Sequence, residues 1–73
     1  MTRIVAANRV IDEDGNEMKP GVVEVEGTYV CSAYPLYGER PFTEWLGGTV
    51  TIGRSADGKL YAYKDGVIIT DNQ

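Results

Sequence analysis

The residue types that usually carry catalysis are scarce in this chain, which has no histidine and a single cysteine, Cys31. A Ser–His–Asp triad needs an imidazole base, and zinc sites draw on Cys, His and carboxylate ligands. We therefore expect no imidazole-dependent catalysis, no metal site and no cofactor. Cys31 lies in the middle of a strand-like run without a histidine to activate it, so we expect a small buried side chain rather than a nucleophile.

Carboxylates are the remaining groups that could carry chemistry. Residues 12–17 superficially resemble a calcium loop, but the sixth and twelfth positions counted from Asp12 are Glu17 and Val23, where an EF-hand needs Gly and Glu. We interpret this segment as a hairpin tip. Glu39 and Glu44 flank an aromatic stretch and are the best pair for carboxylate-only catalysis. A chain this short has little room for a deep pocket beside a core, so we expect a protein that is not an enzyme.

Aromatic residues are the most promising candidates for a binding surface. Exposed aromatic side chains on a β-surface suit stacking on sugars or contact with a protein partner. The alternative is that some of them cap the open end of the sheet. The candidate residues are Tyr34, Tyr37, Phe42, Trp45, Tyr61 and Tyr63.

Length and charge limit the class of protein. Seventy-three residues predict one domain, residues 1–73. The net charge of −4 argues against nucleic acid and against anionic membrane surfaces as partners. The sequence starts without a signal-peptide pattern and contains no run of about 18 apolar residues. We therefore expect a cytoplasmic protein.

The elements that must position these residues are short strands between frequent turns. Dipeptides such as Glu26-Gly27, Asp57-Gly58 and Asp65-Gly66 are typical hairpin turns. Val23 and Val25 alternate with Glu24 and Glu26, the period of a half-buried strand. The sequence predicts an all-β fold, a small sandwich or partly open barrel of about six to seven short, mostly antiparallel strands. We expect at most one helical turn, near residues 41–46.

Three segments together resemble a known family. They are Arg3-Ile-Val-Ala-Ala-Asn-Arg-Val-Ile-Asp-Glu-Asp-Gly15, Met18-Lys-Pro-Gly-Val-Val-Glu-Val-Glu-Gly-Thr-Tyr-Val30 and Leu60-Tyr-Ala-Tyr-Lys-Asp-Gly-Val-Ile-Ile69. They resemble the first strands and the final hairpin of metal-dependent amidohydrolases, in which both chain ends meet in a small β-sandwich beside a catalytic TIM barrel. The barrel and its His-x-His metal motif have no counterpart here. The resemblance therefore implies the accessory sandwich alone, without the family's catalytic residues.

Two functional hypotheses follow. The first is a non-catalytic β module that acts by protein association, either as a homo-oligomer or as a small accessory subunit; it predicts an exposed apolar patch. The alternative is a module that binds a small molecule, such as a neutral metabolite or a sugar, through the six aromatic residues.

Overall fold

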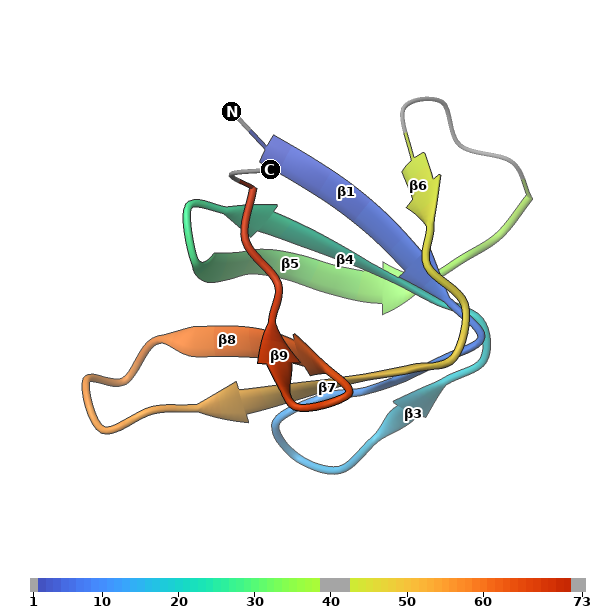
Figure 1. Cartoon of the computed structure of the whole chain (residues 1–73). Helices are drawn as coiled ribbons and strands as arrows, with labels where there is room; N and C mark the ends of the chain where they lie inside the picture. Colours follow the sequence, from blue (N-terminus) through green and yellow to red (C-terminus); the bar gives the residue numbers. More distant parts are fainter. Residues whose placement is uncertain (1, 39–42, 72–73) are drawn as a thin grey trace.

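The protein folds into two β-sheets in a computed structural model that describes residues 2–38 and 43–71 (Figure 1). Sheet A contains, in spatial order, β5 (Tyr29–Pro35), β4 (Gly21–Glu26), β1 (Thr2–Ala7) and β6 (Thr43–Trp45). Sheet B contains β3 (Glu17–Met18), β2 (Arg9–Ile11), β7 (Thr49–Arg54), β8 (Leu60–Lys64) and β9 (Val67–Ile68). The predicted all-β fold is confirmed, and the sheets are not closed into a barrel.

The chain crosses from one sheet to the other at a shared bend, on the right of Figure 1. Strand β1 continues into β2 through Asn8, and β3 continues into β4 through residues 19–20. Because β1 pairs antiparallel with β4, and β2 with β3, residues 2–26 form one long hairpin folded over at its middle. Strands β6 and β7 follow the same bend and run parallel to β1 and β2. Dividing long strands in this way gives nine short strands in the described residues, instead of the six to seven expected.

Close backbone packing at the bend depends on particular small residues. A Cβ atom on Gly21 would lie 2.7 Å from Cγ2 of Val10, which is closer than real side-chain contacts allow. Gly48 has a φ of +65°, a conformation that glycine adopts without steric cost. Its amide donates to Oδ1 of Asn8 at 2.7 Å, and its carbonyl accepts from the Arg9 amide at 3.1 Å. These contacts fix the point at which β6–β7 turns beside β1–β2.

The core between the sheets is built from small aliphatic side chains. The largest fully buried side chains are all valines. Every aromatic side chain in the described part of the chain is exposed or half-buried. The core is therefore thin for two sheets of this length. Its buried residues are Val5, Ala7, Val10, Val23, Val25, Val50, Ile52, Ala62 and Ile69.

Residues 69–71, the C-terminal strap, lie across the end of the sandwich where β1 begins (Figure 1). The Ile69 side chain is buried and its amide donates to the Ala62 carbonyl at 2.8 Å. The Asp71 amide donates to the carbonyl of Gly27 at 2.9 Å, in the turn between β4 and β5. The strap therefore joins sheet B to a hairpin tip of sheet A.

A β-bulge in β5 changes which side chains face the core. Val25 pairs with Val30, whereas Glu24 pairs with Ser32, so Cys31 is an additional residue without a partner in β4. The expectation that Cys31 is a small buried side chain was wrong, because it is the bulge residue and its side chain is exposed.

The segment after β5 also differs from expectation. The sequence allowed one helical turn near residues 41–46, but Thr43–Trp45 is a strand that pairs in parallel with β1. Residues 41 and 42 lie outside the described part of the chain. Tertiary pairing with β1 determines the conformation here, because the four residues 43–46 before Gly47 are too few to stabilise a helix on their own.

Candidate functional site

The predicted aromatic residues are distributed over separate parts of the surface. Cross-strand register places Tyr34 and Trp45 on the outer face of sheet A, and Tyr61 and Tyr63 on the outer face of sheet B. Tyr37 follows β5 and is 83% exposed, and Phe42 lies outside the described residues. The described aromatics therefore do not converge on one cavity.

On the outer face of sheet A, two aromatics flank small aliphatic side chains. The register aligns Tyr34, Val22, Ala6 and Trp45 in one row across the four strands. Val22 and Ala6 are 0% and 1% exposed although they point away from the core. The Tyr34 hydroxyl donates to a carboxylate oxygen of Glu24 on the same face. The Tyr34 side chain is half-buried, whereas Trp45 is 56% exposed.

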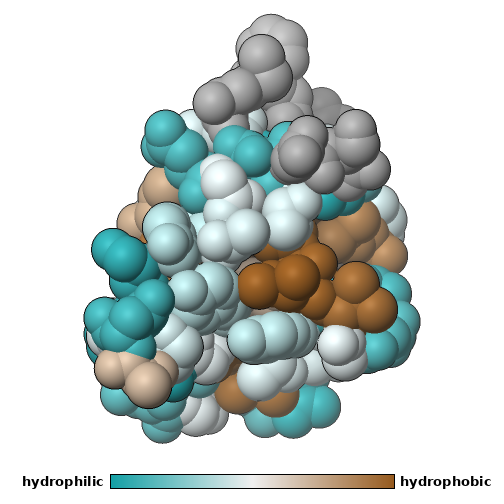
Figure 2. All heavy atoms as spheres, turned by 60° about the vertical axis from the view of Figure 1, so that its left-hand side comes forward, coloured by the Kyte–Doolittle hydropathy of each residue, from teal (hydrophilic) through white to brown (hydrophobic). Residues whose placement is uncertain are grey.

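The outer face of sheet B carries a more exposed apolar row. Ile11, Thr51, Tyr63 and Ile68 are paired successively across β2, β7, β8 and β9, and we call these four residues the sheet B patch. Tyr63 and Ile68 are each 37% exposed. The space-filling view in Figure 2 shows a molecule whose mainly hydrophilic surface is interrupted by compact apolar areas.

Charge separates the two outer faces. Glu24 and Glu26 of β4 lie on the outer face of sheet A, on the same side as Tyr34. Strands β7, β8 and β9 contain no acidic residue. Glu17 in β3, at the edge of sheet B, is neutralised by Arg9 at 2.7 Å and Lys19 at 3.2 Å. Ion pairing with Lys19 and Arg9 lowers the pKa of Glu17. The four residues of the sheet B patch therefore carry no charge, and the carboxylate next to Ile11 in the register, Glu17, is ion-paired, within a protein of net charge −4.

A small pocket opens beside β5, between that edge of sheet A and sheet B. Its volume is about 190 Å³, below the 300–1,000 Å³ typical of sites for drug-sized ligands. Apolar side chains from both sheets line it, and acidic residues of the turn between β2 and β3 lie at its rim. The lining residues are Asp12, Glu13, Met18, Val30, Cys31, Ser32, Ala33, Ile52 and Leu60.

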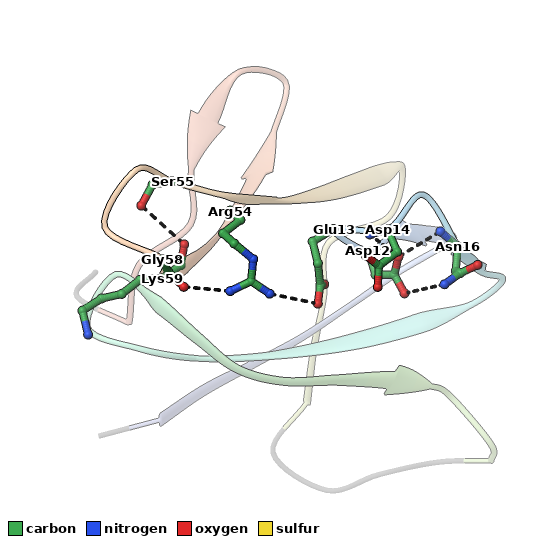
Figure 3. Close-up of polar contacts among 8 residues, drawn as sticks. All are labelled: Asp12, Glu13, Asp14, Asn16, Arg54, Ser55, Gly58 and Lys59. Atoms are coloured by element: carbon green, nitrogen blue, oxygen red, sulfur yellow. Dashed lines mark hydrogen bonds and ion pairs between the residues drawn. The ribbon is translucent and has the colours of Figure 1, made fainter.

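Polar contacts fix the turns beside this pocket (Figure 3). Oδ1 of Asp12 accepts from the amides of Asn16 at 2.8 Å and Asp14 at 2.9 Å, and these hydrogen bonds lower the Asp12 pKa. Arg54 lies between the two turns: it donates to the Gly58 carbonyl at 2.8 Å and approaches Glu13 at 3.8 Å. The predicted hairpin tip at residues 12–17 is confirmed, and Asp12 is its organising residue.

Cys31 lines the pocket, but its surroundings disfavour the thiolate. Local desolvation and the Glu26 carboxylate, 3.8 Å from the sulfur, raise the pKa of the thiol. Because the thiolate is the reactive form, the geometry makes Cys31 a poor nucleophile.

Glu44, one member of the candidate carboxylate pair, is held by an ion pair. Its two carboxylate oxygens accept from Nε and Nη2 of Arg3 at 3.0 and 2.9 Å, and Arg3 lowers the Glu44 pKa. The other member, Glu39, lies outside the described residues. Arg3 also donates to the Thr70 carbonyl at 2.9 Å, so Glu44 takes part in anchoring the C-terminal strap.

No family model, curated protein or solved structure matches this chain. Within residues 2–38 and 43–71, no group of three or more His, Cys, Asp or Glu side chains is arranged to hold a metal ion. Nor does that part of the chain contain a helix long and apolar enough to cross a membrane. Two candidate sites among the described residues are the sheet B patch and the pocket beside β5.

Sequence reasoning found Tyr63 but missed its partners in the sheet B patch. Ile11 and Ile68 lie 57 positions apart in the sequence, and only the order of strands β2-β7-β8-β9 brings them into one row. The alternation of Tyr61 and Tyr63 with Leu60 and Ala62 left open which of the two faces is the core. The structure decides this, because Ala62 is buried and both tyrosines therefore lie on the outer face.

Proposed function

We propose that this domain is a non-catalytic module that acts by protein association, and that its partner is a second copy bound through the sheet B patch. The observation that carries the proposal is the row of Ile11, Thr51, Tyr63 and Ile68, partly exposed on a face without unpaired acidic residues. Isologous pairing of two such faces is the usual way in which a single surface patch forms a closed dimer.

The thin core supports association. A domain of this size buries only about 60% of the surface that its unfolded chain exposes, and valine is the largest side chain buried completely here. Oligomerisation is one of the ways in which small domains gain the missing apolar burial. Stacking two sheet B faces would add a second apolar layer beside the existing core.

Charge supports a second copy as the partner. Two molecules of net charge −4 repel each other over most of their surfaces, and Glu24 and Glu26 make the outer face of sheet A unsuitable for self-contact. The sheet B face avoids this repulsion. A stable interface needs roughly 800 Å² per partner, about a sixth of the 4514 Å² surface of this domain.

Neighbouring residues of β9 provide the test. Ile68 faces outward beside Tyr63, whereas Val67 pairs with Lys64 on the opposite side of the strand and is 67% exposed. We expect Ile68→Asp to raise the dimer Kd on the order of 100-fold or more, because each of two equivalent copies loses an apolar contact. Val67→Asp is the matched control and should leave the Kd within about threefold.

Sedimentation equilibrium over a range of concentrations measures these values, with circular dichroism to confirm that each variant folds. A wild-type protein that stays at the 8.0 kDa of one chain at all concentrations would contradict self-association. A dimer weakened equally by both substitutions would place the interface elsewhere. The resemblance to the accessory sandwich of amidohydrolases stays a prediction. If it holds, the outer face of sheet B would bind a larger subunit instead of a second copy.

A small-molecule site formed by all six aromatic residues has less support. Trp45 and Tyr63 lie on the outer faces of different sheets, so one neutral ligand cannot contact both. Trp45 is 56% exposed and is the only tryptophan, and its fluorescence would report any ligand bound to the outer face of sheet A.

A further inference from the structure

Strand β5 is an unpaired edge of sheet A. It pairs with β4 on one side, and no strand among the described residues pairs with its other side. With seven residues it is also the longest strand described. An edge strand presents free backbone donors and acceptors that can template another strand, and the addition of an extended peptide to such an edge is a recurrent binding mode.

The two ends of the β5 edge differ in how far they are covered by other parts of the protein. At its start, the ring of Tyr29 contacts that of Tyr61 from β8 in an edge-to-face arrangement with centroids 5.5 Å apart. Beyond this contact, Val30, Cys31, Ser32 and Ala33 line the pocket. The pocket therefore lies beside the accessible part of the edge, where an added strand would run.

The size of the pocket suits one apolar side chain. Its volume of about 190 Å³ is smaller than the 300–1,000 Å³ of sites for drug-sized ligands. Val30, Ala33, Met18, Ile52 and Leu60 give it apolar walls from both sheets. In strand addition, backbone hydrogen bonds supply affinity and pockets for alternate side chains supply specificity.

Acidic residues flank the part of this edge that lines the pocket, whereas Lys59 lies over the Tyr29 ring at the start of the edge, 4.8 Å from its centroid. Asp12 and Glu13 line the pocket on the side of sheet B, and Glu26 lies 3.8 Å from the Cys31 sulfur on the other side. Arg54, between the two turns in Figure 3, is already engaged by Glu13 and by the Gly58 carbonyl. An incoming segment with lysine or arginine beside its apolar anchor would match this charge, whereas an acidic segment would be repelled.

We propose that the free edge of β5 binds an extended basic peptide segment of another protein by strand addition, with one apolar side chain anchored in the adjacent pocket. The occupant is defined by this chemistry: an extended backbone, a side chain of about leucine size, and a cation two residues away on the same side. The site is separate from the sheet B patch, so Ile68→Asp should leave it intact.

Peptide titration followed by ¹⁵N–¹H NMR tests the proposal. The probe is the blocked peptide Lys-Thr-Leu-Thr-Lys, in which the leucine and both lysines project to the same side of an extended chain. We expect shift changes centred on residues 30–34, and slower hydrogen exchange of backbone amides on the free side of β5. Glu-Thr-Leu-Thr-Glu and Lys-Thr-Gly-Thr-Lys, which lack the charge and the anchor respectively, should each bind at least about fivefold more weakly.

Two substitutions in one turn provide the matched comparison. Glu13 lines the pocket, whereas Asp14 is an exposed neighbour that does not. Glu13→Lys should weaken binding of the basic peptide on the order of fivefold, and Asp14→Lys should change it less. Equal affinity for the basic and acidic peptides, shift changes confined to the sheet B patch, or no shift changes at millimolar peptide would each overturn the proposal.

Discussion

At the scale of single residues, Arg3 connects more of the structure than any motif in the sequence suggests. Its guanidinium donates to both carboxylate oxygens of Glu44 in β6 and to the Thr70 carbonyl in the C-terminal strap. The planar fork of arginine matches a carboxylate in a way that the lysine ammonium does not. One side chain of β1 therefore holds two segments from the second half of the chain.

We predict that Arg3→Ala lowers the free energy of unfolding by about 1–3 kcal/mol at pH 7, because charge-assisted hydrogen bonds are lost at a partly buried site. Arg3→Lys should recover part of the loss, since it restores the charge without the paired hydrogen bonds. Urea unfolding at one fixed protein concentration measures both variants. If Arg3→Lys has the full wild-type free energy of unfolding, the paired hydrogen bonds from Arg3 to Glu44 contribute nothing to stability.

The same pair predicts a pH dependence. Arg3 lowers the pKa of Glu44 below its ordinary value of 4.5, so the folded state binds this proton less readily than the unfolded state. The stability that the pair contributes is then present above pH 4.5 and is lost as the pH falls through the folded-state pKa. The difference in unfolding free energy between wild type and Arg3→Ala should therefore shrink from pH 6 to pH 3. A difference that stays constant over this range would contradict the assignment.

Cys31 illustrates where residue-level prediction stops. Its place in the middle of a strand-like run suggested a buried side chain, but Cys31 is the residue that a bulge adds to β5, and the bulge reverses the faces of the later residues. Nothing in the local sequence marks the bulge, since it arises from the pairing of β5 with β4.

At the scale of elements, turns were predictable from the sequence and bends were not. Asp65 and Gly66 both have positive φ, of 55° and 78°, as a two-residue hairpin turn requires. The Asp-Gly pair predicts this turn, because both residue types tolerate positive φ. Asn8, in contrast, ends β1 and sends the chain into sheet B without a preceding glycine or proline. Its role depends on the amide of Gly48, 40 positions away, and such a contact leaves no local signal.

Two glycines in strands differ in the space around them: a side chain would clash at Gly21 but not at Gly53. Gly21 is surrounded: an added Cβ would lie 2.7 and 2.8 Å from Val10 atoms and 3.0 Å from Cβ of Met18. Gly53 in β7 has no atom within 4 Å of the same position. We predict that Gly21→Ala destabilises the protein by about 1–3 kcal/mol through overpacking at the bend, whereas Gly53→Ala is neutral or slightly stabilising because it restricts the unfolded chain.

Thermal unfolding by circular dichroism checks this pair of variants. For a domain of this size, 1 kcal/mol corresponds to roughly 4–8 °C in Tm. A decrease of similar size in both variants would mean that glycine flexibility, and not the contact with Val10, is needed at the bend.

At the scale of the whole molecule, residues 69–71 close one end of the sandwich. Composition and turn spacing were sufficient to predict an all-β domain, because dense Gly turns between β-branched runs leave little alternative. The order of strands was not predictable, since parallel pairing of β6–β7 with β1–β2 joins segments about 40 residues apart. The same nonlocal pairing assembles the sheet B patch, which explains why only Tyr63 of its four residues was predicted.

The C-terminal strap should therefore contribute to the stability of the whole sandwich. Ile69 is 6% exposed and packs in the core, whereas Val67, two residues earlier, is 67% exposed. We predict that Ile69→Ala lowers the free energy of unfolding by about 2–4 kcal/mol through loss of buried volume, a large share of what a 73-residue domain has available. Val67→Ala is the matched control and should change it by less than about 0.5 kcal/mol.

Because the strap connects sheet B through Ala62 to the β4–β5 turn through Gly27, Ile69→Ala should also speed hydrogen exchange at the turn-facing Asp71 amide. The exchange is measured without denaturant. In the Val67→Ala control, the Asp71 amide should exchange at the wild-type rate. Equal stability of the two variants would mean that the sandwich closes without the strap. Destabilisation by Ile69→Ala with unchanged exchange at Asp71 would mean instead that Ile69 acts only by filling the core, and that the hydrogen bond to Gly27 holds the strap in place independently.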